Sequence, residues 1–379
     1  MTENAIVVIT YNRLVSLKRL IKSLLCAEYS GDQIDLIVSM DCSGDRDLEL
    51  YIESISWPFG EIVKVFHEEK LGLKKHVLFC GSFTKKYENL YIFEDDLYVS
   101  KGFYAYGKGA IDFYKDDERI AGISLYQYEW NQYANLRFDP IHDEYDTYFL
   151  QVASSWGQIW NRKKWNAFIE WMQNYCDEDL KNIEDLPAVV SSWSKNSWLK
   201  FHHAYLVVEN KYFVYPRVAL STNFSEPGQH ALLDSTYQVN LLHGVKNNYR
   251  FPTLENGIKY DGYFENKEIF INGYENVTVD LYGTKKIKRD YFLSTIILPY
   301  KVEKSFALRL RPWELNIINE VSGEGVYLYK KDNNKLSFLK HNYLEALRRR
   351  YLFKINTRKG LFVIWVSLIF ESLMRRLKK

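Results

Sequence analysis

The chain has 379 residues, of which 47% are hydrophobic and 26% are charged, so it is long enough for one large globular domain and an appendage. Its formal net charge of +2 excludes a generally basic surface for nucleic acid. The four cysteines form neither a CxxC pair nor a zinc-ligand spacing, and the first residues lack a secretion signal. These features favour a cytoplasmic protein with reduced thiols and no nucleic-acid partner.

Strands and helices are predicted to alternate along the first hundred residues. Residues 5–10 are mostly β-branched, as in a parallel strand covered on both faces, and leucines recur at helical spacing over 14–25. Further strands are predicted over 34–39, 62–66 and 90–93, with helices over 48–55 and 73–87 between them. This alternation predicts an α/β fold with a mostly parallel sheet, whose ligands bind at the carboxyl ends of the strands.

The apolar run over 90–93 ends abruptly in three carboxylates, Glu94, Asp95 and Asp96. Burying three like charges in a core is costly, so the triplet must lie where the strand emerges and faces water or a cation. Mn²⁺ or Mg²⁺ fits such a place, because these ions take carboxylate oxygens together with substrate phosphates. A solvated acidic turn is the alternative interpretation.

Three polar segments are expected to meet at the carboxyl edge of the predicted sheet: residues 10–13, Asp41 and the acidic triplet. Arg13 can reach a base or a phosphate, and Asp41 can accept a hydrogen bond from uracil N3–H or a ribose hydroxyl. The triplet can hold ribose and metal. Together these groups fit a nucleotide sugar.

At these residues the chain resembles glycosyltransferases of the Rossmann-like GT-A fold. Residues 7–13 are similar to family 2 enzymes of bacterial polysaccharide assembly, and residues 37–42 and 93–99 are similar to N-acetylglucosaminyltransferase I. The resemblance lies in ordered blocks within residues 1–230. It implies that Thr10, Tyr11, Asn12, Arg13 and Asp41 bind the nucleotide, that Glu94 and Asp95 lie on its ribose and phosphate side, and that Asp96 ligates the metal.

Two later blocks extend the resemblance. Residues 155–157 are similar to an acceptor-side Gly-Trp segment of the family, which implies that Trp156 stacks on an acceptor sugar; a core tryptophan is the alternative. Residues 216–220, followed by 228–230, resemble a late strand and the flexible loop that covers the donor. His230 would then contact the metal or the diphosphate, with a surface histidine as the alternative.

The general base departs from the family's pattern. The family places a carboxylate just after a tryptophan that corresponds here to Trp198, but Leu199 and Lys200 follow it. Residues 183–186 resemble the Glu-Asp pair of many family 2 enzymes, so Asp185 is the predicted base. Several other acids before Trp198 remain alternatives, and a solvated helix face is the other interpretation for each: Glu170, Asp177, Glu178, Asp179 and Glu184. His202 and His203 are further candidates, with a structural role as their alternative.

Three segments are expected: a nucleotide-sugar-binding catalytic domain over 1–240, a β-rich extension over 241–339, and a basic amphipathic tail over 340–379. The uncharged run 361–370 is flanked by arginines and lysines and is too short to span hydrocarbon. It predicts a membrane-associating helix on an anionic surface, with packing on the catalytic domain or a dimer partner as the alternative. We therefore expect a peripheral protein on the inner face of the cytoplasmic membrane.

The sequence predicts a metal-dependent glycosyltransferase, and the resemblance implies that it inverts the anomeric carbon. It would move a sugar from a nucleoside diphosphate, expected to be UDP, to a hydroxyl of a bacterial surface glycan such as capsule or O-antigen, free or lipid-linked. A sugar-phosphate nucleotidyltransferase needs a glycine-rich loop, which residues 10–13 lack. A catalytically silent sugar-nucleotide-binding or scaffold subunit of a membrane glycan-assembly complex is the second hypothesis, because no acid directly follows Trp198.

Overall fold

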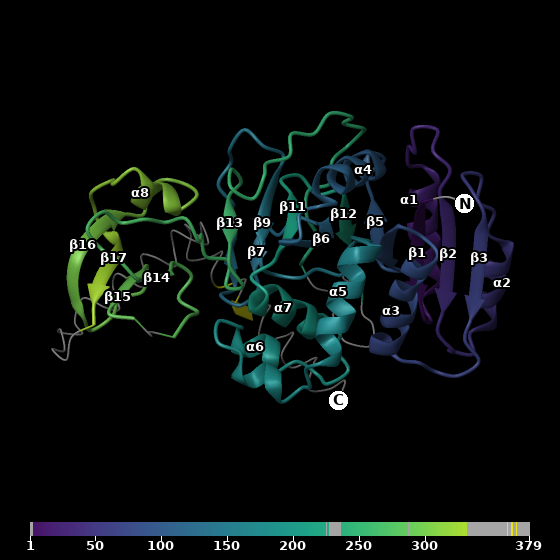
Figure 1. Cartoon of the computed structure of the whole chain (residues 1–379), viewed down its shortest axis with the longest axis horizontal. Helices are drawn as coiled ribbons and strands as arrows, with labels where there is room; N and C mark the ends of the chain where they lie inside the picture. Colours follow the sequence, from purple (N-terminus) through teal and green to yellow (C-terminus); the bar gives the residue numbers. More distant parts are fainter. Residues whose placement is uncertain are drawn as a thin grey trace. The chain divides into compact units, whose positions relative to one another are not determined.

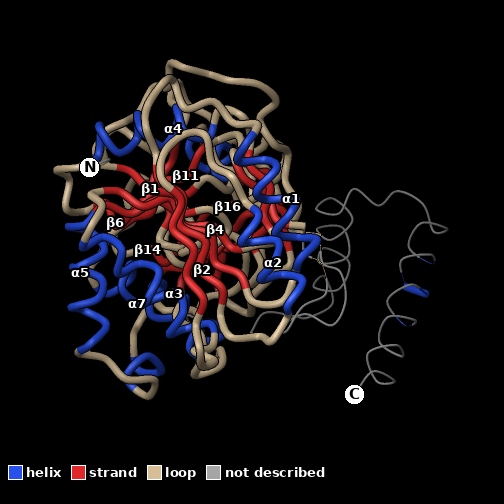
Figure 2. The backbone as a smooth tube through the Cα atoms, turned by 90° about the vertical axis from the view of Figure 1, so that its right-hand side faces the viewer, coloured by secondary structure: helices blue, strands red, loops and turns tan. Residues whose placement is uncertain are grey.

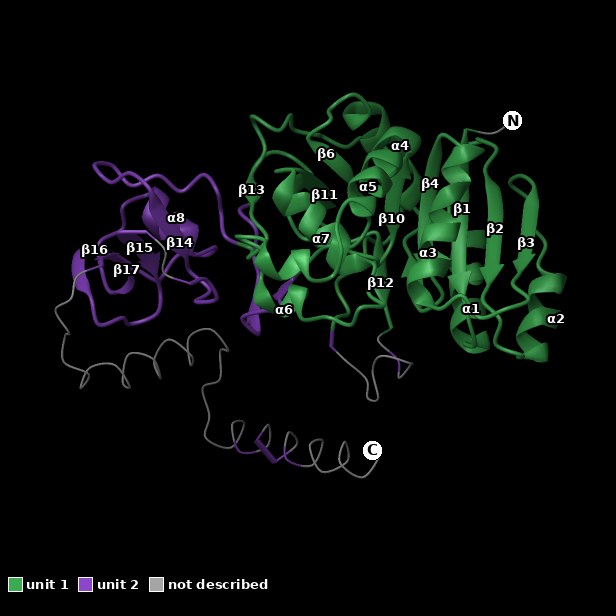
Figure 3. Cartoon of the chain, turned by 60° about the horizontal axis from the view of Figure 1, so that its bottom comes forward, with its two compact units in different colours: residues 1–128, 142–224, 237–264 green, residues 129–141, 225–236, 265–379 purple. Residues whose placement is uncertain are grey.

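The computed structural model forms two compact units, which are described separately (Figure 3). The described residues are 3–224, 226, 236–286 and 289–331, together with Phe362, Trp365, Val366 and Ile369. The first unit contains Met1–Tyr128, His142–Phe224 and Tyr237–Phe264, and the second contains Glu129–Ile141, Ser225–Thr236 and Glu265–Lys379. The division of the chain near residues 240 and 340 stays a prediction.

One half of the first unit's central sheet is parallel (Figure 1). It contains β1 (Asn4–Thr10), β2 (Asp35–Met40), β3 (Ile62–Phe66) and β4 (Asn89–Glu94). β1 lies between β2 and β4, and β3 forms the edge beside β2. The four strands predicted from the first hundred residues are thus confirmed, and β1 and β2 are buried almost throughout, as strands covered on both faces should be.

The other half of the sheet mixes strand directions. It contains β6 (Ile120–Ser124), β9 (Thr147–Leu150), β10 (Gln158–Asn161), β11 (Tyr212–Pro216) and β13 (Lys259–Tyr260), and the whole order is β13-β9-β11-β6-β10-β4-β1-β2-β3. β10 runs antiparallel to both of its neighbours, β4 and β6, while β11 is parallel to β6. Because β10 is antiparallel, it begins at the edge where β4 ends.

Helices cover both faces of this sheet (Figure 2). The cluster of buried residues around Ile6 and Val8 includes side chains of α1 (Leu14–Leu25), α2 (Arg46–Ser54) and α4 (Phe103–Tyr114). The opposite face carries α3 (Leu73–Gly81), α5 (Arg162–Gln173) and α7 (Leu199–Val208) (Figure 2). α3 is shorter than predicted, because residues Ser82–Lys85 continue it as the 3₁₀ helix η1.

The second unit is rich in β structure. Its four-stranded sheet has the order β14-β15-β17-β16, formed by Val277–Asp280, Tyr291–Ser294, Gly325–Lys330 and Lys301–Ala307, and the short helix α8 spans Glu314–Ile318. A two-stranded hairpin, β7 (Trp130–Asn131) and β8 (Leu136–Arg137), belongs to the same unit.

The predicted C-terminal tail lies almost wholly outside the described residues. Phe362, Trp365, Val366 and Ile369 are helical and exposed, and their spacing places them on one face of a helix. Among the described helices, none has the length and hydropathy needed to span a membrane.

Candidate functional site

The acidic triplet lies where β4 ends. Glu94 is the last residue of β4 and is in register with Ile9 of β1, so Thr10 lies at the same edge of the sheet. Asp95 and Asp96 form the turn into β5 (Leu97–Val99), which pairs with β12 (Ser221–Asn223). The fold therefore brings the end of the first strand and the triplet together at one edge.

Arg13 bridges two carboxylates of the triplet. Its Nη2 is 2.6 Å from Asp95 Oδ1 and its Nη1 is 3.0 Å from Asp96 Oδ2. The hydroxyl of Thr10 donates to Asp95 Oδ2 at 2.8 Å. The Asp95 side chain is 3% exposed and that of Asp96 is 15% exposed. Asp96 Oδ1 is buried and has no hydrogen-bond partner in the described part of the chain.

Burial makes these carboxyl groups hard to ionise together. It raises the pKa of Asp95 to about 6, although Arg13 acts in the opposite direction. The pKa of Glu94 is raised to about 8, first by burial and then by the neighbouring charge of Asp96, while a hydrogen bond from Ser155 lowers it. Three carboxylates thus share one guanidinium, and a divalent cation would relieve their repulsion.

The residues present fit a metal held mainly by its substrate. No group of three or more histidine, cysteine or acidic side chains in the described residues is arranged to hold an ion by itself. Asp96, with a buried and unpartnered oxygen, is the best ligand on geometric grounds, and phosphate and water oxygens would complete an Mn²⁺ or Mg²⁺ shell. His230, the other predicted contact of this site, lies outside the described residues.

Asp41 has a structural task that the sequence did not indicate. Its Oδ1 accepts hydrogen bonds from the backbone N–H groups of Leu71 and Cys42 at 2.7 and 2.9 Å, and its Oδ2 accepts from Gly72 at 2.9 Å. Burial alone would raise the pKa of Asp41, but these hydrogen bonds outweigh burial and hold the pKa below its usual value. Asp41 thereby fixes Leu71 and Gly72, in the loop between β3 and α3, at the end of β2, and its predicted contact with the nucleotide stays a prediction.

The loop fixed by Asp41 reaches back to the first strand. Lys70 Nζ donates to the hydroxyl of Tyr11 at 2.9 Å and lies 4.6 Å from the centre of its ring. Asn12 beside it is exposed. Lys70 is a cation at this edge that no motif had indicated, since its place depends on a contact between residues far apart in sequence.

The segment before β10 lies beside Glu94, because β10 is antiparallel to β4. The Ser155 hydroxyl hydrogen-bonds the carboxylate of Glu94. Trp156 is partly buried, with ring centres of Tyr126 and Tyr237 at 4.7 and 5.6 Å. Its acceptor role stays a prediction, and the partly buried ring makes the core interpretation equally compatible with the structure.

Asp185 occupies an exposed loop between the 3₁₀ helix η2 (Asp179–Asn182) and α6 (Ala188–Ser191). Its φ of 64° lies in the left-handed region, which aspartate tolerates better than most residues. A Cβ atom built on Gly262 would lie 3.6 Å from the carbonyl oxygen of Asp185. Its predicted role as the base stays a prediction.

Lys200, which follows Trp198 and Leu199, is fully buried. Its Nζ donates to Asp177 Oδ2 at 2.5 Å and to the carbonyl oxygen of Trp193 at 3.0 Å. Trp198 is also buried and stacks on His202. No sequence motif pairs Lys200 with Asp177, because Asp177 lies between α5 and η2, Lys200 lies in the first turn of α7, and the two meet only in the fold.

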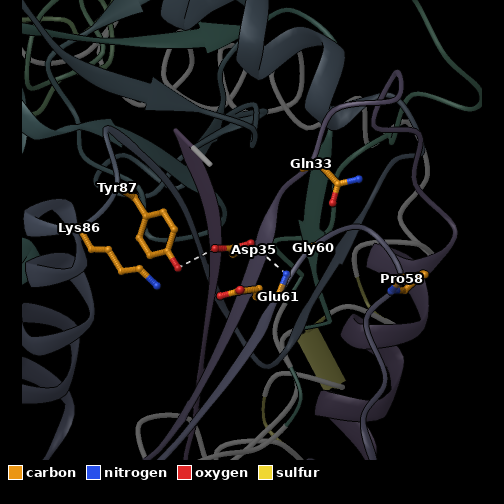
Figure 4. A pocket seen from close by; sticks show the side chains of 7 residues that line it. All are labelled: Gln33, Asp35, Pro58, Gly60, Glu61, Lys86 and Tyr87. Atoms are coloured by element: carbon orange, nitrogen blue, oxygen red, sulfur yellow. Dashed lines mark hydrogen bonds between the residues drawn. The ribbon is translucent and has the colours of Figure 1, made fainter. Parts of the chain in front are cut away.

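A pocket lies at the opposite edge of the sheet, and none of the residues that line it belongs to the acidic triplet (Figure 4). It has a volume of about 410 Å³ and is lined by Gln33, Asp35, Pro58, Gly60, Glu61, Lys86 and Tyr87. Asp35 begins β2, so the pocket lies at the amino ends of the parallel strands, where ligands of such sheets do not usually bind. The carboxyl edge of the sheet, which carries Glu94, Asp95 and Asp96 and is called the acidic edge below, is therefore the better candidate site.

Comparisons with known proteins give only distant similarities. No model of a known protein family matches the chain, and no curated protein matches it. A crystal structure of S. aureus TarS 1–349 in complex with UDP-GlcNAc matches with a TM-score of 0.37 and 17% identity, covering 60% of each chain. Another crystal structure of TarS 1–349 matches with a TM-score of 0.34 and 16% identity over 57% of this chain and 60% of that chain.

The mannosyltransferase PcManGT from Pyrobaculum calidifontis, in complex with GDP-Man and Mn²⁺, has a TM-score of 0.38 and 10% identity over 60% of this chain and 59% of that chain. The matches thus span about three fifths of each of these relatives. The similarity to N-acetylglucosaminyltransferase I stays a prediction.

Proposed function

We propose that this protein is a glycosyltransferase that moves a sugar from a nucleoside diphosphate to a hydroxyl of a glycan. The observation that carries the proposal is the acidic edge, where Arg13 bridges Asp95 and Asp96 and one oxygen of Asp96 is buried without a partner in the described chain. A buried carboxylate oxygen without a partner is costly unless a ligand completes its contacts. A metal-bound diphosphate would do so.

Each residue of this edge would bind a different part of the donor. Asp96 would ligate Mn²⁺ or Mg²⁺, which would neutralise the charge that develops on the departing diphosphate. Arg13 already lies within hydrogen-bond distance of the triplet and can turn to a phosphate oxygen. Tyr11, Asn12 and Asp41 would line the nucleotide, and Glu94 and Asp95 its ribose and phosphate side.

We propose that the acceptor is a bacterial surface glycan, free or lipid-linked, and that transfer inverts the anomeric carbon. The basic residues flanking 361–370 would attract an anionic membrane on its cytoplasmic face. Exposed Phe362, Trp365, Val366 and Ile369 share one helical face, which supports this peripheral contact.

The test is a titration of the full chain with UDP-GlcNAc and GDP-mannose, the nucleotide sugars present in the TarS and PcManGT structures, with Mn²⁺ and with EDTA. We expect binding that needs Mn²⁺, and nucleotide release that accelerates with a glycan acceptor. Metal-dependent binding without release under any acceptor condition would favour the silent subunit. Equal binding in Mn²⁺ and EDTA would contradict the metal assignment.

A further inference from the structure

The first turn of α7 is directed toward the edge of the sheet that carries the acidic triplet. α7 is followed by β11, which is parallel to β6 and therefore points to the edge where β4 ends. The last turn of α7 lies at the start of β11, where Lys211 N donates to Leu206 O at 2.9 Å. A ten-residue helix is about 15 Å long, enough to return across the sheet. Its first residues, Leu199 and Lys200, therefore lie nearer the carboxyl edge of the sheet than its last residues do.

A contact between helices supports the same placement. Lys74 Nζ lies 3.9 Å from the ring centre of Phe201, in the first turn of α7. Lys74 itself is in the first turn of α3, two residues after Gly72, whose N–H donates to Asp41. The amino ends of α3 and α7 therefore meet beside the loop that Asp41 holds at the end of β2.

One carboxylate at this meeting point is held rigidly and still reaches solvent. The Lys200 side chain is 0% exposed, and its ammonium pairs with Asp177 Oδ2 at 2.5 Å. Asp177 is 35% exposed, and its only hydrogen bond in the described residues uses that one oxygen, which leaves the other oxygen for solvent or substrate. A buried ammonium needs its counter-charge, so Asp177 is fixed in place.

We infer that Asp177 is the residue that accepts the proton of the acceptor hydroxyl, which rests on the proposed function and extends it. The acceptor oxygen forms a bond to the anomeric carbon of the donor as its proton passes to the open oxygen of Asp177. The bond from that carbon to the phosphate oxygen breaks, and its electron pair leaves with the nucleoside diphosphate. Lys200 is the positioning residue that orients Asp177.

Asp185 lies at the other end of α7. A Cβ atom built on Gly262 would be 3.6 Å from the carbonyl oxygen of Asp185 and 3.1 Å from Cγ2 of Val207, which is in the last turn of α7. Val207 is seven positions after Lys200, about 10 Å along the helix. Of the two acids, Asp177 therefore lies nearer the carboxyl edge of the sheet, and the fold favours it over Asp185.

The experiment compares three variants of the full chain: Asp177→Asn, Asp185→Asn and the control Glu209→Gln, an exposed acid at the end of α7. With the donor and acceptor that the wild type uses fastest, Asp177→Asn should lose about 100-fold or more in kcat. Its Kd for UDP-GlcNAc with Mn²⁺ should stay within about twofold of the wild type, as in the control. A comparable loss in Asp185→Asn with an active Asp177→Asn would overturn the inference.

The same carboxylate balances a buried lysine, so folding needs its own measurement. The double variant Asp177→Asn, Lys200→Met lacks the buried ammonium. Its Tm should be higher than that of Asp177→Asn, because an apolar residue replaces an unpaired ammonium. Recovery of Tm without recovery of kcat supports the inference, and recovery of both overturns it. Sodium formate should also restore part of the transfer in Asp177→Ala but not in the control, and no rescue would count against a base.

A wrong assignment of Asp177 and a wrong proposed function give different results. If the wild type binds UDP-GlcNAc and GDP-mannose but transfers neither sugar to any acceptor, the proposed function fails, and the assignment of Asp177 falls with it. If the wild type transfers and Asp177→Asn transfers equally fast, only the assignment of Asp177 is wrong.

Discussion

Both edges of the central sheet carry buried carboxylates, but their hydrogen bonding differs. Asp35, at the amino end of β2, has both oxygens occupied: Tyr87 OH donates to Oδ2 at 2.8 Å and the N–H of Glu61 donates to Oδ1 at 3.0 Å (Figure 4). Asp96, at the carboxyl edge, has a buried oxygen without a partner in the described residues. A carboxylate satisfied within the fold stabilises that fold, whereas one kept unsatisfied is available to a ligand.

The largest effect should come from Asp96→Ala. It removes the proposed metal ligand, so the affinity for UDP-GlcNAc in Mn²⁺ should fall more than about 100-fold, or about 2.7 kcal/mol. Stability should be unchanged or higher, because one of three crowded negative charges is lost. Titration calorimetry and urea unfolding measure the two quantities, with the exposed Asp116→Ala as control. Unchanged affinity would contradict the role of Asp96.

Asp35→Ala should behave in the opposite way. It leaves the Tyr87 hydroxyl and the Glu61 N–H without their acceptor, which should lower the free energy of unfolding by about 2 kcal/mol. Donor affinity should change less than about twofold, because the residue lies at the other edge. Glu61→Gln, an exposed acid of the same pocket, is the matched control for urea unfolding. A loss of donor affinity with normal stability would contradict the statement that Asp35 stabilises the fold and does not bind the donor.

Arg13→Met should change the affinities for Mn²⁺ and for UDP in opposite directions. The guanidinium now neutralises Asp95 and Asp96, so its removal should increase the affinity for Mn²⁺ alone by about tenfold, or about 1.4 kcal/mol. The affinity for UDP should fall, because a phosphate contact is lost. Mn²⁺ and UDP titrations measure these opposite changes, and Lys22→Met, an exposed cation of α1, is the control. Parallel changes in both affinities would contradict the proposed role of Arg13.

The sequence predicted the features that depend on local patterns. The spacing of leucines located α1, and a β-branched run located β1, because each pattern reflects burial of one element against the sheet. The acidic triplet could be placed at the end of a strand because it directly follows the apolar run 90–93. The antiparallel insertion of β10 between β4 and β6 was not predictable, since nothing within a four-residue strand specifies its partners.

The hydrogen-bond partners of Asp177 and Asp41, two candidate site residues, could not be predicted from the sequence either. Lys200 pairs with Asp177, 23 positions earlier, and Asp41 holds backbone groups 30 and 31 positions later. Such contacts depend on how helices and loops pack on the sheet edge, and no local spacing encodes them. The sequence could therefore locate the acidic triplet at the end of a strand, whereas the donor contacts and the acid that acts on an acceptor stay predictions.

Asp41 gives the smallest and most discriminating test, because it lies at the candidate functional edge yet both of its oxygens are hydrogen-bonded within the fold, like those of Asp35. The three backbone hydrogen bonds hold its pKa below the usual value, so the charged form stabilises the folded protein above about pH 4 and this stabilisation is lost as pH falls through the folded pKa. Asp41→Asn should therefore be about 1 kcal/mol less stable at pH 7, with a smaller difference near pH 3.

Urea unfolding at both pH values measures this difference, with Glu69→Gln in the same loop as the control. A pH-independent difference would mean that the hydrogen bonds to Leu71, Gly72 and Cys42 do not favour the charged form. If Asp41→Asn instead keeps full stability and loses UDP affinity, then the place of a carboxylate on the sheet, rather than its hydrogen bonding, decides whether it serves the fold or the ligand.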